Sequence, residues 1–133
     1  ASVPMTGSLV LDTSAVLAFF HGNETATEAL NQATIVYLPS IAVGELYFGV
    51  RKCSNPDQEE TKVNAIIART EAMNVDYDTA KIYASIINQL QSKGKRIPSN
   101  DIWIAALTIQ HKCCLLARDL HFTRVEDLDL ISL

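Results

Sequence analysis

The chain has 133 residues, of which 15 are acidic and 11 basic, and its formal net charge is −4. This length is typical of one domain, and the acidic balance is not that of a protein that binds nucleic acid through bulk positive charge. No apolar run approaches the roughly 20 residues of a membrane span. The hydrophobic content of 48% is ample for one core, and a homo-oligomer would bury any surplus.

The cysteines bear on where the protein is located, and the first residues bear on where its fold begins. Cys53, Cys113 and Cys114 are odd in number and show no C-x-x-C spacing, so we expect reduced thiols and a cytoplasmic protein. The first residues lack the basic and hydrophobic stretches of a signal peptide. We interpret residues 1–7 as an N-terminal tail, in which residues 1–4 are a cloning remnant or a frayed end.

The first predicted element is a short strand that ends in a carboxylate. Residues 9–11 are all apolar, which is typical of a strand buried on both faces, and Asp12 follows directly. In open α/β sheets, ligands bind at the carboxyl ends of the strands. Asp12 is therefore a candidate site residue. It is equally suited to cap the helix that follows, and the sequence leaves both roles open.

The rest of the chain alternates between helices and strands. We predict helices over residues 14–20, 24–33, 41–53, 58–71, 79–93 and 101–107, and strands over 35–38, 73–75, 113–117 and 129–131. The expected helix caps are Asn23 or Thr25, then Ser40, then Asp78, and finally Ser99 or Asn100. This alternation predicts an α/β fold with three layers, in which helices cover both faces of a mostly parallel sheet of four to five strands.

Glu45 is the only carboxylate on the predicted helix over residues 41–53, which is apolar nearly all round. It shares a face with Ile41 and Phe48, because residues three or four apart lie on the same side of a helix. A carboxylate on such a face must find a cation, a metal ion or hydrogen-bond donors, or take up a proton. The alternative is that Glu45 reaches solvent from the edge of that face.

The densest basic cluster precedes another acidic residue. Lys93, Lys95 and Arg96 lie just before Asp101, which opens a helix. The cations either decorate the end of the preceding helix or form an edge that contacts phosphates. Because Ser99 or Asn100 is able to cap the helix, Asp101 is free for another task.

Four carboxylates are therefore candidates for one site. The strand over residues 113–117 leads into Asp119, as the first strand leads into Asp12, and parallel strands end at one rim. Two charges about 5 Å apart repel by about 3 kcal/mol at an effective dielectric of 20, which a divalent cation relieves. All-oxygen ligands indicate Mg²⁺, or Mn²⁺ as a substitute. Water bound to such an ion is a nucleophile suited to phosphodiesters.

The same residues resemble the PIN domain family, and more narrowly the VapC toxins of bacterial type II toxin–antitoxin systems. The resemblance is carried by residues 9–14 (Leu-Val-Leu-Asp-Thr-Ser), Glu45, residues 97–106 and residues 115–122. It implies one PIN-like domain over residues 8–133, an endoribonuclease that depends on Mg²⁺, inhibition by a VapB-like antitoxin, and a homodimer. Ala117 departs from the pattern, because Ser or Thr is common there.

By position, the resemblance implies that the family's four metal-site acids correspond to Asp12, Glu45, Asp101 and Asp119, and Ser14 matches a position that is often polar. Independently of the resemblance, Ser14 and Asn100 are candidates to support the acids, because metal ligands usually have hydrogen-bond partners. The candidates for contact with the RNA backbone are Lys95, Arg96 and Arg118. His21, His111 and His121 have no ligand spacing, and ordinary packing is the expected role of His121.

Two other functions remain as alternatives. One is a PIN-like module that binds RNA or protein with little catalysis. The other is a receiver-type phosphoacceptor domain, which needs an acidic pair after the first strand and a late lysine. Asp12 is followed by Thr13 and Ser14 instead, and no lysine follows the strand over residues 113–117, so the sequence argues against a receiver.

Overall fold

Five strands form one parallel sheet at the centre of the fold. The structure is a computed structural model that describes residues 7–133, so the predicted tail lies outside the described residues except for Gly7. The order is β3-β2-β1-β4-β5, and all four pairings are parallel. The strands are β1 (Ser8–Leu11), β2 (Ile35–Pro39), β3 (Glu71–Met73), β4 (Cys114–Ala117) and β5 (Leu130–Ser132).

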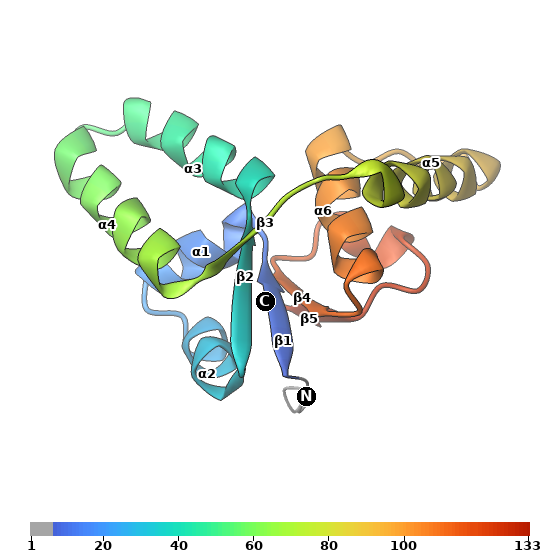
Figure 1. Cartoon of the computed structure of the whole chain (residues 1–133). Coiled ribbons are helices and arrows are strands. Elements are labelled where there is room, and N and C mark those ends of the chain that lie inside the picture. Colours follow the sequence, from blue (N-terminus) through green and yellow to red (C-terminus); the bar gives the residue numbers. More distant parts are fainter. Residues whose placement is uncertain (1–6) are drawn as a thin grey trace.

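Helices cover both faces of this sheet, as Figure 1 shows: α1 to α4 lie on one side of β1 and β2, and α5 and α6 lie on the other. They are α1 (Thr13–Phe20), α2 (Glu24–Gln32), α3 (Ser40–Arg51), α4 (Pro56–Arg69), α5 (Tyr77–Ser92) and α6 (Ser99–Gln110), with a 3₁₀ turn, η1 (Phe122–Arg124). Crossovers between parallel strands are right-handed. The chain steps outward from β1 to β3 and then back to β4, so the two sets of helices lie on opposite faces. The predicted three-layer architecture is confirmed.

The strand order reverses between β1 and β4, so the carboxyl ends of these two inner strands form a topological switch point. The register pairs Leu9 with Cys114 and Leu11 with Leu116, and the backbone N–H of Asp12 donates to the carbonyl of Leu116 at 3.1 Å. Ligands of open α/β sheets bind outside the carboxyl ends of the strands at such a point. The order also differs from the 2-1-3-4-5 arrangement of receiver domains, so the receiver alternative is wrong.

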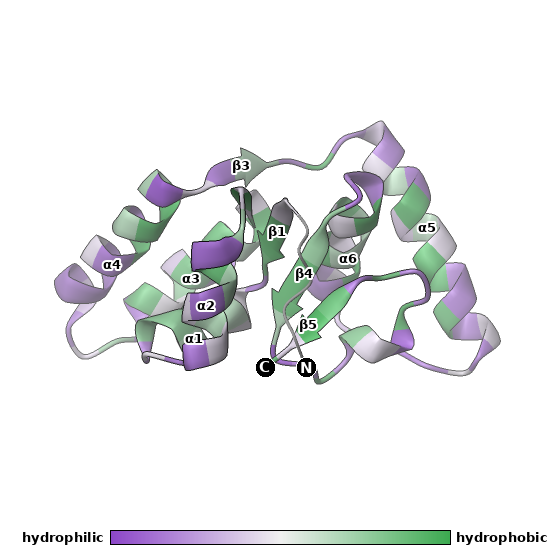
Figure 2. Ribbon diagram, turned by 90° about the horizontal axis from the view of Figure 1, so that it is seen from below, coloured by the Kyte–Doolittle hydropathy of each residue, from purple (hydrophilic) through white to green (hydrophobic). Residues whose placement is uncertain are grey.

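The core lies on these two central strands. Val10, Leu11, Leu115 and Leu116 have no exposed surface, and α6 adds Ile104 and Leu107 from one face. Figure 2 shows the same division, with hydrophobic residues on the strands and hydrophilic residues on the outer sides of the helices. No helix within residues 7–133 has the length and apolar character needed to cross a membrane.

Three of the predicted helix starts are wrong in detail, whereas Asn23 caps α2 as expected. Asp76, not Asp78, caps α5: its carboxylate accepts the backbone N–H of Thr79, whose hydroxyl in turn accepts the backbone N–H of Asp76. This reciprocal pair satisfies two amides that the helix itself leaves free.

The other two corrections involve proline. Pro39 and Pro98 occupy the cap positions of α3 and α6, and neither helix has a side-chain cap. Ser40 and Ser99 are instead the first residues of those helices. The third strand is also shifted: it covers Glu71–Met73 and not residues 73–75, because α4 ends at Arg69.

Candidate active site

Asp12 lies at the end of β1 and is 7% exposed. Its Oδ2 accepts the backbone N–H of Ser14 at 3.2 Å and the Ser14 hydroxyl at 2.5 Å, so Asp12 is the N-cap of α1. Both bonds go to Oδ2, so Oδ1 takes no part in the cap. The two roles that the sequence left open are therefore compatible, because the cap leaves one carboxylate oxygen for another ligand.

Glu45 comes from α3 and is half-buried. Its Oε1 accepts the hydroxyl of Thr13, the first residue of α1, at 3.0 Å. Glu45 was expected to need a hydrogen-bond donor, and Thr13, which had no expected role of its own, supplies one. The signal for Thr13 was present, because this hydroxyl follows Asp12 directly at the end of the strand.

Asp101 lies in the first turn of α6 and is close enough to both acids for their charges to act on it. Burial raises the pKa of Asp101 from 3.8 to about 6; the carboxylate of Asp12 contributes next, and that of Glu45 also raises it. Repulsion of this kind favours the neutral form of a carboxylic acid. The structure thus gathers Asp12, Glu45 and Asp101 from three separate elements at the switch point.

His121 belongs to the same region. It lowers the pKa of Asp101, in opposition to the carboxylates. Its Nδ1 is buried, and no residue of the described chain forms a hydrogen bond with it. Sequence analysis assigned His121 to packing; its position beside the acids could not be read from the spacing, because the loop after β4 brings it there.

Asp119 is placed differently from the other three acids. It lies two residues beyond β4 and is half-buried. Its Oδ1 accepts the backbone N–H of Thr123 at 3.2 Å, within the turn that contains η1. Asp119 is not among the charges that shift the pKa of Asp101. Its place in the site remains a prediction.

The three gathered acids fit a hard divalent cation by their chemistry. They offer carboxylate oxygens, which are the ligands that Mg²⁺ and Mn²⁺ prefer. Their mutual repulsion, visible at Asp101, is what a cation relieves. Within residues 7–133, no three His, Cys, Asp or Glu side chains stand as a ready ligand set.

Two of the supporting residues lie close to these acids in the chain, but only one contacts them. The hydroxyl oxygen of Ser14, besides donating to Asp12, accepts the backbone N–H of Arg118 at 2.9 Å. Ser14 therefore ties the loop after β4 to the carboxylate after β1. Asn100 is exposed in the first turn of α6, and its supporting role remains a prediction.

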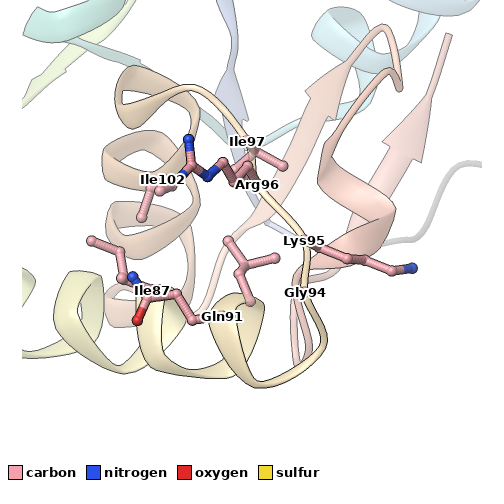
Figure 3. A pocket seen from close by; sticks show the side chains of 8 residues that line it. Ile87, Gln91, Gly94, Lys95, Arg96, Ile97 and Ile102 are labelled. Carbon is pink, nitrogen blue, oxygen red and sulfur yellow. The ribbon is translucent and has the colours of Figure 1, made fainter.

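The predicted RNA-contacting cations are all exposed. Lys95 and Arg96 line a pocket of about 440 Å³ between the end of α5 and the start of α6. In Figure 3, Lys95 points away from Ile87 and Ile102, whereas Arg96 extends beside Ile102. Arg124 donates through Nη1 to the carbonyl of Arg96 at 2.9 Å and so holds this loop. Their contact with RNA remains a prediction.

The fold and the acidic cluster define a class of α/β protein whose site lies at the switch point between β1 and β4. The chain belongs to the PIN domain family: the family model, described as "PIN domain", matches residues 9–128. This match covers both strands of the switch point and all four of the predicted acids.

Similar proteins include named ribonucleases. The chain is 28% identical to Ribonuclease VapC5 of Mycobacterium tuberculosis over 131 residues, covering 95% of this chain and 92% of the relative. It is 26% identical to Ribonuclease VapC4 of the same organism over 95 residues, covering 70% and 73%. The solved structure of VapBC-5 from Mycobacterium tuberculosis matches with a TM-score of 0.79 and 25% identity, covering 96% of this chain and 99% of that one. VapBC2 from Rickettsia felis, solved with a promoter DNA fragment, has the same fold, with a TM-score of 0.84 at 24% identity, covering 95% and 98%.

Proposed function

We propose that this chain is a metal-dependent endoribonuclease of the VapC kind, which hydrolyses phosphodiester bonds of RNA. The observation that carries the proposal is the gathering of Asp12, Glu45 and Asp101 at the switch point of a chain that belongs to the PIN domain family. The ribonuclease names of the relatives support the same reaction.

Asp12 and Asp101 are assigned to the principal cation, Mg²⁺ or Mn²⁺, with Glu45 as a further ligand or as acceptor of a bound water. When bound, such an ion neutralises phosphate charge and lowers the pKa of water, so that hydroxide is available at neutral pH. Ser14 and Thr13 fix the orientation of Asp12 and Glu45 through their hydroxyls. Hydrogen-bond partners of this kind commonly matter 10- to 100-fold for metal sites, as an order of magnitude.

The remaining roles follow the position of each residue around the cluster. Asp119 is assigned to a second cation or to the orientation of the attacking water. Arg118 follows β4 directly and precedes Asp119, and Lys95 and Arg96 precede α6, which carries Asp101. These exposed cations are assigned to RNA phosphates. They allow a chain of net charge −4 to bind a polyanion locally.

The partners proposed for the chain are a cognate antitoxin of the VapB type and a second copy of itself. The support is the likeness to VapBC structures, in which a VapC relative was solved within a toxin–antitoxin system. An RNA-cleaving toxin of this kind acts where cellular RNA is present, so we place the chain in the cytoplasm.

The proposal is tested by incubating total cellular RNA with the protein, with and without Mg²⁺, and mapping the cut sites by sequencing. We expect cuts that require Mg²⁺ or Mn²⁺ and disappear in the Asp101→Asn variant. Asp57→Asn is the matched control, because Asp57 is exposed in the first turn of α4. Equal cutting by parent and Asp101→Asn would show that Asp101 is not a ligand. Binding of RNA without any cutting would favour the non-catalytic alternative.

A further inference from the structure

A second pocket, of about 410 Å³, opens beside the acidic cluster and has no role so far. One face of α1 forms its floor, and the turn after α1 and the loop after β4 form its rim. We call it the α1 pocket, and its defining residues are Ser14, Leu17, His21, Gly22, Asn23 and Arg118.

We propose that the α1 pocket holds one nucleotide of a single-stranded RNA substrate, the one that adjoins the scissile phosphate. The inference rests on the proposed ribonuclease function and specifies how that site selects its substrate. It identifies Leu17, His21 and Arg118 as the residues that contact this nucleotide.

The first support is the connection between the pocket and the acids. Ser14 lines the pocket, and its hydroxyl is bonded both to Asp12 and to the backbone N–H of Arg118. One side chain thus separates the pocket from a proposed metal ligand. An RNA strand whose phosphate lies at the acids has its neighbouring nucleotide within reach of the pocket.

The second support is an exposed apolar surface on the floor. Leu17 is 45% exposed, although Ala15, Val16 and Ala18 around it on α1 are buried. Ser14, Leu17 and His21 follow one another at intervals of three and four residues, so they lie on one face of the helix. Unpaired bases bind proteins by stacking on flat or apolar side chains, including His and the guanidinium plane of Arg.

The third support is the charge of the lining. Arg118 and His21 are its ionisable side chains, and no carboxylate lines the pocket. This local balance is opposite to the net charge of the chain, −4. An Arg guanidinium matches the geometry of a phosphate with two parallel donors. An apolar floor beneath a basic rim is suited to the base and the phosphate of one nucleotide.

The fourth support is that hydrogen bonds fix the conformation of the rim. Asn23 caps α2 through its Oδ1, which accepts the backbone N–H of Ala26 at 2.9 Å, and its own backbone N–H donates to the carbonyl of Ala18 at 3.0 Å. Gly22 has a φ of 78°, which L side chains rarely adopt, and a Cβ there would meet no atom within 4 Å. The volume lies at the small end of the range for ligand pockets, about 300–1,000 Å³, which suits one nucleotide.

Binding is measured first, in the Asp101→Asn background, which keeps the RNA intact. Fluorescence anisotropy follows a labelled single-stranded RNA that contains a mapped cut site, in the presence of Mg²⁺. We expect Leu17→Asp and Arg118→Ala each to weaken binding about tenfold, the order expected for losing one stacked base or one phosphate contact. Leu17→Asn provides a second variant without added charge, and a thermal melt checks the folding of each variant.

The controls make comparable substitutions outside the pocket. Val75→Asp alters another exposed aliphatic side chain, 40% exposed, between β3 and α5, and Arg51→Ala removes an exposed arginine at the end of α3. We expect both to bind RNA as the parent background does. Equal binding by the pocket variants and these controls would overturn the proposal. So would pocket variants that bind RNA normally but lose a co-expressed antitoxin, because the pocket would then be a peptide site.

Cleavage then locates the nucleotide. Abasic residues are placed one at a time along the RNA, and kcat/KM is measured for the otherwise unaltered protein and for Leu17→Asn. We expect one abasic position next to the cut site to lower kcat/KM for the parent about tenfold and to have little further effect in Leu17→Asn. If every position affects both proteins equally, the pocket does not hold a base. If the parent cuts no RNA at all, the proposed function fails; the anisotropy assay is then run with a labelled single-stranded RNA of mixed sequence, and equal binding by pocket variants and controls still overturns the pocket.

Discussion

The ends of β1 and β4 look alike in sequence but differ in structure. Each buried strand leads into an aspartate, yet Asp12 follows β1 directly, whereas Arg118 separates Asp119 from β4. Asp12 accepts both the backbone N–H and the side-chain hydroxyl of Ser14, and it acts electrostatically on Asp101. Asp119 accepts a backbone N–H within its own loop. Two acids that follow neighbouring parallel strands are thus held by different hydrogen-bond partners, and these partners decide where each carboxylate points.

The largest expected effect separates the two aspartates by activity. Asp12→Asn should lower RNA cleavage about 1,000-fold, roughly 4 kcal/mol of transition-state stabilisation, whereas Asp119→Asn should cost about tenfold or less. Asn caps helices as well as Asp does, so Asp12→Asn keeps the start of α1. Initial rates on one mapped RNA in Mg²⁺ measure both. Equal losses would mean that the two strand ends contribute equally.

A second experiment compares the partners of the two carboxylates. Ser14→Ala removes the hydroxyl that binds Asp12 and Arg118, so cleavage should fall about tenfold or more, as for other partners of metal ligands. Thr123→Ala keeps the backbone N–H that binds Asp119, so its rate should remain near that of the parent. The same cleavage assay measures both variants. A loss in Thr123→Ala as large as that in Ser14→Ala would contradict the comparison.

The hydroxyl of Thr13 offers a smaller test on the β1 side. Thr13→Val keeps the side-chain shape but removes the hydrogen bond to Glu45. Net contributions of such bonds are about 1 kcal/mol, so Mn²⁺ affinity should fall about fivefold by titration calorimetry. Thr61→Val is the matched control, because the Thr61 hydroxyl donates to the carbonyl of Asp57 on α4, far from the acids in the chain. Unchanged Mn²⁺ affinity in Thr13→Val would show that Glu45 does not contribute to binding of the cation.

The smallest effect concerns stability in metal-free protein. Because the pKa of Asp101 is raised to about 6 from 3.8, the folded state holds its proton more tightly than the unfolded state. Below pH 3.8, Asp101 is neutral in both states and does not lower the free energy of unfolding. As pH rises from 3.8 through about 6, the unfolded state ionises first, so the free energy of unfolding falls, and the loss is complete above about 6. Asp101→Asn should stabilise the protein at pH 7.5 by about 1 kcal/mol, after allowance for partial exposure, and by less at pH 5.

Melting temperatures in chelator, measured for parent and variant at both pH values, test this prediction. A gain of roughly 3–5 °C is expected at pH 7.5. Asp119→Asn is the control, because its removal relieves no crowding at Asp101. An Asp101→Asn variant that melts below the parent at pH 7.5 would show that the acids are not crowded in the absence of metal.

Most of the fold follows from local patterns that the sequence displays. The continuous apolar runs at residues 9–11 and 113–117 predict buried parallel strands, and the structure has strands there, at Ser8–Leu11 and Cys114–Ala117. Helix boundaries were less predictable where two candidates compete. Asp76 caps α5 in place of Asp78 because it has two partners. Thr79 forms reciprocal hydrogen bonds with it in the first turn, and Gln110 of α6 donates to the same carboxylate at 3.0 Å. That second partner is 34 residues away.

The candidate site shows the same limit. Asp12, Glu45 and Asp101 could be identified from residue type, helix position and family resemblance, and their closeness required only that parallel strands end at one rim. The place of Thr13 directly after Asp12 was a signal, but its bond to Glu45, the position of His121 and the α1 pocket could not be found this way. Each depends on how a loop or a neighbouring helix is placed, which is set by packing and not by the spacing of residues along the chain.

The first turn of α1 has a consequence for inhibition. Ser14 donates to Asp12 and accepts from Arg118 in the loop after β4, and Thr13 donates to Glu45 of α3. This turn therefore connects α3 to the loop after β4. A compound that wedges against the outer face of α1 and tilts it would displace the carboxylates of Asp12 and Glu45 together, which would impair the proposed nuclease site without any contact with the acids themselves.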